Sequence, residues 1–140
     1  MYHNGDGVTQ DYAEAMRWYR LAADQGYARA QSNLGLMYDS GIGVPEDSAE
    51  AARWYRLAAD QGDANAQGML GSMYATGQGV PQDYVQAHMW FNLPASRSTG
   101  EARANAAKGR DLAAGDLTPD GLNEAQRLAR EWDAAHPREP

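Results

Sequence analysis

The residues of this chain that could carry chemistry are few, and their spacing matches no familiar catalytic or metal-binding pattern. Three histidines, His3, His88 and His136, lie far apart, and the chain contains no cysteine. Zinc sites combine histidine, cysteine and carboxylate ligands at short spacings. No serine lies in a Gly-x-Ser-x-Gly elbow. We therefore predict no catalytic residue, no metal and no cofactor, and we expect the protein not to be an enzyme.

Pairs of glycines separated by one residue superficially resemble a nucleotide-binding loop. They occur as Gly5-Asp6-Gly7, Gly41-Ile42-Gly43 and Gly77-Gln78-Gly79. A dinucleotide-binding loop requires a preceding strand and a third glycine that opens a helix. Here the glycines follow predicted helices, so we interpret them as helix ends followed by turns.

The glycine pairs belong to a segment that recurs along the chain. Met1-Tyr2, Met37-Tyr38 and Met73-Tyr74 open three copies at a spacing of 36 residues. Repeats of roughly 20–50 residues indicate a stacked array in which no unit buries its apolar face alone. We place the copies at residues 1–36, 37–72 and 73–114, within one domain of residues 1–133.

Each copy has the pattern of two antiparallel helices. Asp47 is followed three residues later by Glu50, a capping box that begins a helix. Apolar residues at helical spacing follow, and Gly62 ends that helix. We therefore predict an all-α fold. The large residues that we expect in its core, against alanines and glycines of adjacent helices, are Trp18, Tyr19, Leu34, Tyr38, Trp54, Tyr55, Leu70, Tyr74, Trp90 and Trp132.

Arginine pairs flank two of these tryptophans. Arg17 and Arg20 surround Trp18, and the same pattern recurs one copy later. Helical spacing to nearby carboxylates predicts a solvated face with ion pairs. A contact with an acidic peptide is the alternative.

The segment from Ala30 to Gly62 resembles the Sel1-like repeat, a longer relative of the tetratricopeptide repeat. It reads Ala-x-x-x-Leu-Gly-x-x-Tyr-x-x-Gly-x-Gly-Val-x-x-Asp-x-x-x-Ala-x-x-Trp-Tyr-x-x-Ala-Ala-x-x-Gly. The resemblance implies a right-handed α-solenoid of about two to three repeats. First helices would span Ala28–Ser40 and Ala64–Thr76, and second helices Ser48–Asp60 and Tyr84–Leu93. It also implies an adaptor that gathers proteins on a curved surface.

The C-terminal part departs from the repeat, and we expect it to close the array. Pro94 replaces an alanine of the earlier copies and should end its helix early. Lys108 occupies the position of Leu70, so one helix face becomes polar. Thr118-Pro119 is an N-cap followed by a first-turn proline. We predict a capping helix over residues 118–133 and a frayed tail over residues 134–140.

The N-terminal copy has no corresponding capping helix in the sequence. Met1-Tyr2 align with the last turn of a first helix, so the helix expected over Tyr12–Asp24 should expose apolar surface. An exposed apolar patch marks an interface or a truncation. Two explanations stay open, namely that an upstream segment is missing, or that a partner or a second copy of the chain covers this edge.

The composition weighs against nucleic acid and lipid as partners. The chain has 12 Lys and Arg against 19 Asp and Glu, a formal net charge of −7. Nucleic acids and anionic membranes attract basic surfaces instead. No apolar run is long enough to cross a bilayer, and the first residues have no signal-peptide pattern. We expect a protein or peptide partner and, by default, a cytoplasmic protein unless an upstream segment is missing.

The likeness to tetratricopeptide arrays places the first helix of each repeat along a concave groove. The positions that it assigns to the groove are Arg29, Ser32, Asn33, Leu36, Asp39, Asn65, Gly68, Ser72, Thr76, Arg103 and Arg110. They differ between copies, whereas the core positions do not. We expect a shallow peptide groove with hydrogen-bonding amides and a basic lip at Arg103 and Arg110.

Two functions from different classes follow. The favoured one is an adaptor that docks a peptide or protein on the concave face or the open N-terminal edge. The other is a structural subunit whose bare first helix is completed by its neighbour or by a second copy. A hydrolase of the β-lactamase type is a weaker third, because the Sel1-like proteins reported to bind penicillins rely on disulfides and this chain has no cysteine.

Overall fold

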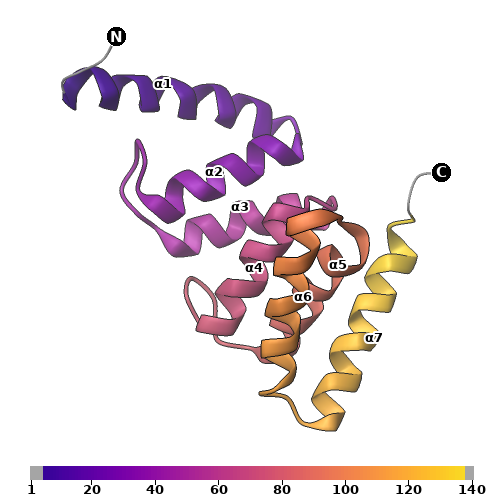
Figure 1. Cartoon of the computed structure of the whole chain (residues 1–140). Helices are drawn as coiled ribbons and strands as arrows, with labels where there is room; N and C mark the ends of the chain where they lie inside the picture. Colours follow the sequence, from indigo (N-terminus) through magenta and orange to yellow (C-terminus); the bar gives the residue numbers. More distant parts are fainter. Residues whose placement is uncertain (1–4, 138–140) are drawn as a thin grey trace.

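The computed structural model describes residues 5–137 of the chain. Within this range it contains seven α-helices and no strand, arranged in series as a solenoid (Figure 1). The helices are α1 (Gly5–Asp24), α2 (Ala28–Ser40), α3 (Ser48–Asp60), α4 (Ala64–Thr76), α5 (Tyr84–Arg97), α6 (Gly100–Ala114) and α7 (Pro119–Ala135). The all-α solenoid predicted from the repeats is confirmed.

Local capping chemistry sets where the repeated helices begin and end. The Asp47 carboxylate accepts a hydrogen bond from the Glu50 N–H at 3.1 Å, and Asp83 caps α5 in the same way. Such a cap satisfies an N–H group that has no partner within the helix. Gly41 and Gly77 end α2 and α4 with φ of 70° and 74°, a conformation that favours glycine.

Glycines let the first and second helices of each repeat approach closely. A Cβ atom on Gly35 would lie 2.7 Å from the Tyr55 ring, and one on Gly71 would lie 3.0 Å from the Phe91 ring. Gly109 of α6 meets the other side of Phe91, where a Cβ atom would lie 2.7 Å away. The aromatic rings therefore pack on bare backbone.

Buried glutamines link one hairpin to the next. Gln31 donates a hydrogen bond to the Ala23 carbonyl at 3.2 Å, and Gln67 repeats this bond one copy later at 3.1 Å. Gln61 donates to the Gln31 side chain at 2.8 Å. These bonds satisfy polar groups that would otherwise be unpaired within the stack.

Arginines of one repeat lie over tryptophans of the next. The Arg20 guanidinium is 5.4 Å from the centroid of the Trp54 ring, and Arg56 lies at the same distance from Trp90. Arg97 lies 5.0 Å from the Trp132 ring. We call these three cation–π contacts the arginine–tryptophan ladder.

The arginines flanking the tryptophans are exposed, as the sequence pattern predicted, and Arg17, Arg53 and Arg56 form the expected ion pairs with carboxylates on their own helices. Arg20 and Arg56 also donate to tyrosine hydroxyls, Arg20 to Tyr38 at 2.8 Å and Arg56 to Tyr74 at 3.1 Å. Arg53 does pair with Glu50 at 2.8 Å, as expected. Arg20 and Arg56 thus contact the next repeat while they remain exposed.

The N-terminal helix differs from the prediction. α1 runs without a break from Gly5 to Asp24, so Gly5-Asp6-Gly7 is helical and Asp11 lies inside the helix instead of capping it. The later copies have Pro45 and Pro81 where this copy has Thr9. Proline excludes the preceding residue from the helical conformation, and threonine does not. Met1, Tyr2 and His3 lie outside the described residues.

The core prediction is wrong for Trp18, whose side chain is 64% exposed. Trp90, at the same position two copies later, is 1% exposed. Trp54 and Trp90 pack on the preceding repeat, whereas no described helix precedes α1. Leu21 is 51% exposed, but its repeat equivalent Leu57 is 49% exposed, so only the exposure of Trp18 reflects the apolar edge expected at this end.

Pro94 does not end α5, which continues through it to Arg97. Pro94 is fully buried, and its carbonyl accepts a hydrogen bond from the Ser98 N–H at 2.9 Å. α5 packs against α4, α6 and α7. Packing on three neighbours holds the helix together where the proline removes one backbone hydrogen bond.

The C-terminal helix α7 lies against α5 and continues two residues beyond the expected boundary at 133. The His136 ring stacks on Trp132 with centroids 3.8 Å apart. Arg97 donates to the Asp133 carboxylate at 2.7 Å and to the His136 carbonyl at 2.5 Å. The tail expected to fray from 134 is therefore held as far as His136, and residues 138–140 lie outside the described range.

Equivalent tryptophans should differ sharply in their contribution to stability. Trp90→Ala removes a buried indole and should lower the free energy of unfolding by about 3–5 kcal/mol. Trp18→Ala removes an exposed indole and should change it by less than about 1 kcal/mol. Urea denaturation of both variants measures the difference. Similar shifts of the two midpoints would contradict the described packing.

Two helical glycines offer a matched pair of alanine substitutions. Gly109→Ala places a Cβ atom against Phe91 and should destabilise the fold by about 1–3 kcal/mol. Gly68 has no atom within 4 Å of its Cβ position, and its φ is not positive. Gly68→Ala should therefore stabilise the fold by about 0.5–1 kcal/mol through helix propensity. A urea midpoint that falls for Gly68→Ala would show that this helix face is not open.

Candidate functional site

The candidate site is a groove between the first helices α4 and α6. It consists of two adjoining hollows that share Ser72, Phe91 and Asn105. We call the two together the α4–α6 groove. Its further lining residues are Ala64, Asn65, Gly68, Met69, Ala75, Thr76, Tyr84, Pro94, Ala102, Ala106, Lys108, Gly109, Leu112, Ala113 and Asp116.

The floor of the groove is apolar and its walls are polar. Phe91 is buried beneath the groove between Gly71 and Gly109. Leu112 stands on the α6 wall with its side chain 68% exposed. Asn65 on α4 and Asn105 on α6 are exposed amides that can both donate and accept hydrogen bonds. The groove therefore offers an apolar seat between two amide-bearing walls.

Charged residues of both signs line one end of the groove. Lys108 and Asp116 lie around the same hollow as Leu112. Among the described residues, no group of three or more histidine, cysteine or carboxylate side chains is placed to hold a metal. The lining fits recognition of a polar chain carrying apolar groups.

The predicted groove residues fall into separate sets. Asn65, Gly68, Ser72 and Thr76 do line the α4–α6 groove. The Thr76 hydroxyl is engaged locally, because it donates to the Ser72 carbonyl at 3.0 Å.

Two predicted residues from α2 line a different hollow. Asn33 and Leu36 lie against Tyr12 and Tyr19 of α1. Arg29 is exposed and Ser32 half-buried on α2, and neither lines the α4–α6 groove. The α2 positions and the α4 positions therefore line different hollows, and whether they act as one groove stays a prediction.

Asp39 lies near a buried residue of the core. Burial, and to a smaller extent the charge of Asp39, raise the pKa of Tyr55. The structure thus relates Asp39 to the core beneath α2 and not to the lining of the α4–α6 groove.

The basic lip expected at Arg103 and Arg110 is not part of the groove lining. Arg103 is exposed on α6, and Arg110 pairs with Asp111 at 3.2 Å. The cation that lines the groove is Lys108. The one sign of this in the sequence was that Lys108 occupies the repeat position of Leu70, so that a charged residue stands where an apolar one is expected. Phe91 stands at the repeat position of Tyr55, which predicted a core residue and not a groove floor. Nothing in the repeat pattern indicated Asn105, because α6 is shifted relative to the earlier copies.

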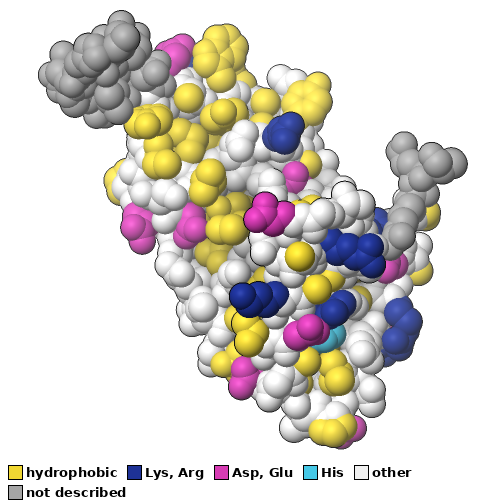
Figure 2. All heavy atoms as spheres, viewed as in Figure 1, with side chains coloured by type: hydrophobic (Ala, Val, Ile, Leu, Met, Phe, Trp, Pro, Cys, Tyr) yellow, Lys and Arg dark blue, Asp and Glu magenta, His cyan; other side chains and the backbone are white. Residues whose placement is uncertain are grey.

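A second hollow lies between α3 and α4, on a different set of residues. Ala49, Arg53 and Leu57 line its α3 side, and Val80 lines the other. Its arginines are already engaged, since Arg53 pairs with Glu50 and Arg56 lies over Trp90. Figure 2 shows hydrophobic side chains gathered over the α1 and α2 end of the molecule, with Lys and Arg more frequent over the opposite half.

His88 is a buried titratable group under α6. Its Nδ1 atom has no hydrogen-bond partner among the described residues. Burial lowers the pKa of His88, the charge of Arg110 lowers it further, and Asp111 opposes both effects. His88 is therefore held in its neutral form where α6 packs on α5.

The lowered pKa of His88 should make the fold sensitive to mild acid. The unfolded chain then binds a proton more readily than the folded one, so stability is lost as the pH falls below about 6.5. The thermal midpoint of His88→Gln should fall less between pH 7.5 and pH 5.5 than that of the unsubstituted protein. Equal pH dependence in His88→Gln and the unsubstituted protein would contradict this account.

Comparisons with solved structures agree with the architecture. A protective antigen present in uropathogenic Escherichia coli strains and displaying an SLR fold superposes with a TM-score of 0.79 and 38% identity, over 87% of this chain and 26% of that chain. A Sel1 repeat protein from Oxalobacter formigenes superposes with a TM-score of 0.63 and 30% identity, over 85% of this chain and 54% of that chain. The chain thus spans about a quarter and about half of the length of these two proteins.

A search of curated proteins finds no match. No helix within the described range has the length and apolar character needed to cross a membrane. The sequence profile of the Sel1 repeat matches residues 1–27, 28–63 and 64–96. Sel1 repeat proteins are generally scaffolds for protein–protein interaction and typically not enzymes. Three repeat matches over most of the chain, together with the shared fold, show that this protein belongs to the Sel1 repeat family.

Proposed function

We propose that this protein is an adaptor that holds an extended segment of a partner protein in the α4–α6 groove. The observation that carries the proposal is the continuity of the two hollows through Ser72, Phe91 and Asn105. A continuous groove between two helices can follow a peptide over several residues. Interaction scaffolding in the family supports the same function.

The chemistry of the groove defines the segment that it would accept. An apolar side chain would sit over Phe91 and against Leu112, where burial of apolar surface is worth about 25 cal/mol per Å². Asn65 and Asn105 would pair with the backbone of the segment, because each amide matches both an N–H and a carbonyl. Lys108 and Asp116 would favour a segment with charges of both signs at that end.

A second function rests on a different surface. α1 exposes Trp18 and Leu21, which are 64% and 51% exposed. Exposed apolar residues grouped on one helix are typical of an interface. The protein would then act as a subunit of a larger assembly joined through α1.

A substitution that fills the groove tests whether a peptide binds there and not elsewhere on the surface. A random peptide library is selected on the unsubstituted protein, and the enriched peptides are measured by fluorescence anisotropy. Ser72→Trp fills the groove at the residue that both hollows share, and should weaken binding at least about tenfold. Ala49→Trp is the matched control on the hollow between α3 and α4, and should leave binding within about twofold.

Two outcomes would contradict the adaptor proposal. One is that no peptide is enriched on the unsubstituted protein. The other is that Ala49→Trp weakens binding as much as Ser72→Trp does. Circular dichroism spectra of both variants check that the helices are intact.

A further inference from the structure

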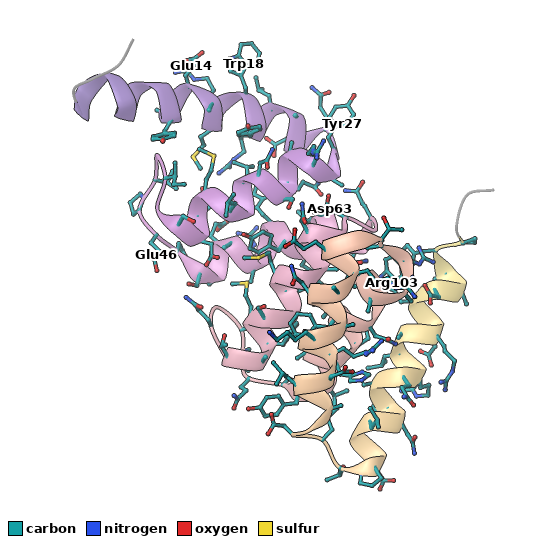
Figure 3. All side chains as sticks on the ribbon, in the orientation of Figure 1. Glu14, Trp18, Tyr27, Glu46, Asp63 and Arg103 are labelled. Atoms are coloured by element: carbon teal, nitrogen blue, oxygen red, sulfur yellow. The ribbon has the colours of Figure 1, made fainter. Side chains whose placement is uncertain are left out.

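The hollow between α3 and α4 is an open apolar surface in the middle of the stack. It has a volume of about 500 Å³, and Leu57 in its wall is 49% exposed. The helices on both sides of α3 in the series, α1 and α5, are part of the described chain. Repeats added before α1 would pack on the side where Glu14 and Trp18 project, away from α2 (Figure 3). Such repeats would lie beyond α1 and not over this hollow.

The same face is closed one repeat later. Arg53 and Leu57 of α3 correspond to Met89 and Leu93 of α5. Met89 and Leu93 are 6% and 0% exposed, and they belong to the same apolar cluster as Ala129 of α7. α7 lies against α5, whereas α3 packs mainly on α2 and α4. A packed helix thus buries on α5 the face that stays open on α3.

The charges in the lining define what this open face would accept. Arg53 and Arg56 line the hollow, and no carboxylate of the described chain lines it. An apolar cover like α7 would remove both guanidiniums from water without supplying a counter-charge, which is costly. A carboxylate from outside would supply that charge. The net charge of −7 of the whole chain opposes this only weakly, since charges beyond about 8 Å are screened at physiological salt.

Both guanidiniums remain able to bind a carboxylate. Arg53 donates to Glu50 through Nη1, and a guanidinium has five N–H donors. An ion pair as exposed as this one contributes only about 0–1 kcal/mol, so Arg53 readily shares its charge with a second carboxylate. Arg56 is held in place, because it lies over Trp90 and donates to the Tyr74 hydroxyl. A fixed guanidinium loses less conformational freedom on binding.

We infer that the hollow between α3 and α4 is a second docking surface, for an acidic segment of a partner protein in which an aliphatic side chain stands beside carboxylates. The aliphatic side chain would contact Leu57 and Val80, and the carboxylates would pair with Arg53 and Arg56. This surface is separate from the α4–α6 groove, whose lining carries charges of both signs. The inference therefore does not depend on the proposed function of that groove.

The test isolates peptides that bind this hollow. A random peptide library is selected on the unsubstituted protein and counter-selected on Ala49→Trp, which fills the hollow. Peptides held by the α4–α6 groove also bind Ala49→Trp and are removed. The groove consists of two adjoining hollows and should dominate a selection without this step.

Fluorescence anisotropy then compares two arginine variants on the retained peptides. Arg53→Gln removes a guanidinium of the lining and spares Arg56, which supports the ladder. Arg29→Gln is the charge-matched control, because Arg29 is exposed on α2 and lines neither the hollow nor the groove. Urea midpoints of both variants check that the fold is intact.

The expected result is a loss that depends on charge at one place. The retained peptides should be enriched in Asp and Glu next to Leu, Ile or Val. Arg53→Gln should weaken their binding about threefold or more, and Arg29→Gln less than about 1.5-fold. Exchanging the acidic residues of the peptide for Asn and Gln should cause a similar loss. Combining that exchange with Arg53→Gln should add little, because both changes remove the same contact.

Three outcomes would overturn the inference. One is that no peptide survives the counter-selection. Another is that the retained peptides are not acidic, or lose as much affinity on Arg29→Gln as on Arg53→Gln. The third is self-association in sedimentation velocity that Ala49→Trp abolishes, because a second copy would then occupy the hollow. None of these outcomes decides the function of the α4–α6 groove, which Ser72→Trp tests separately.

Discussion

Close approach of helices over glycine is the constraint on which the rest of this structure depends. A short helical hairpin has too little apolar surface to fold alone, so each hairpin must pack on its neighbours. Gly35 and Gly71 remove the side chains that would hold the helices apart, and aromatic rings fill the space against the backbone. Phe91 has glycines on both sides, so α6 can lie close to α5. That approach places the α6 wall of the groove opposite α4.

The cation–π contacts and the buried glutamines give the stack a direction. Each ladder contact joins an arginine of one repeat to a tryptophan of the next, and each glutamine bond reaches back to the preceding hairpin. A unit therefore presents different chemistry on its two sides. At the C-terminal end, α7 supplies Trp132, which receives the last arginine of the ladder, Arg97. At the other end an aromatic face is left on the surface of α1.

The candidate groove arises where the repeat is no longer regular. In α6, Lys108 stands at the repeat position of Leu70, and the polar side chains of Asn105 and Lys108 remain beside solvent in the groove. The same region buries His88 beneath α6, with an unpaired ring nitrogen. The candidate groove and the buried His88 thus lie at the same departure from the repeat.

The sequence by itself determined the helical hairpins, their caps at Asp47 and Asp83, and the membership of a stacked array, because these depend on local patterns that recur in register. Even the unbroken helix α1 had a local signal, since Thr9 replaces the proline of the later copies. Only the tertiary structure decided the rest. It kept α5 helical through Pro94 by packing, left Trp18 exposed for lack of a neighbour, and paired α4 with α6 around the groove. These features depend on which helices touch, and the contacts between helices are not encoded in the spacing within any one of them.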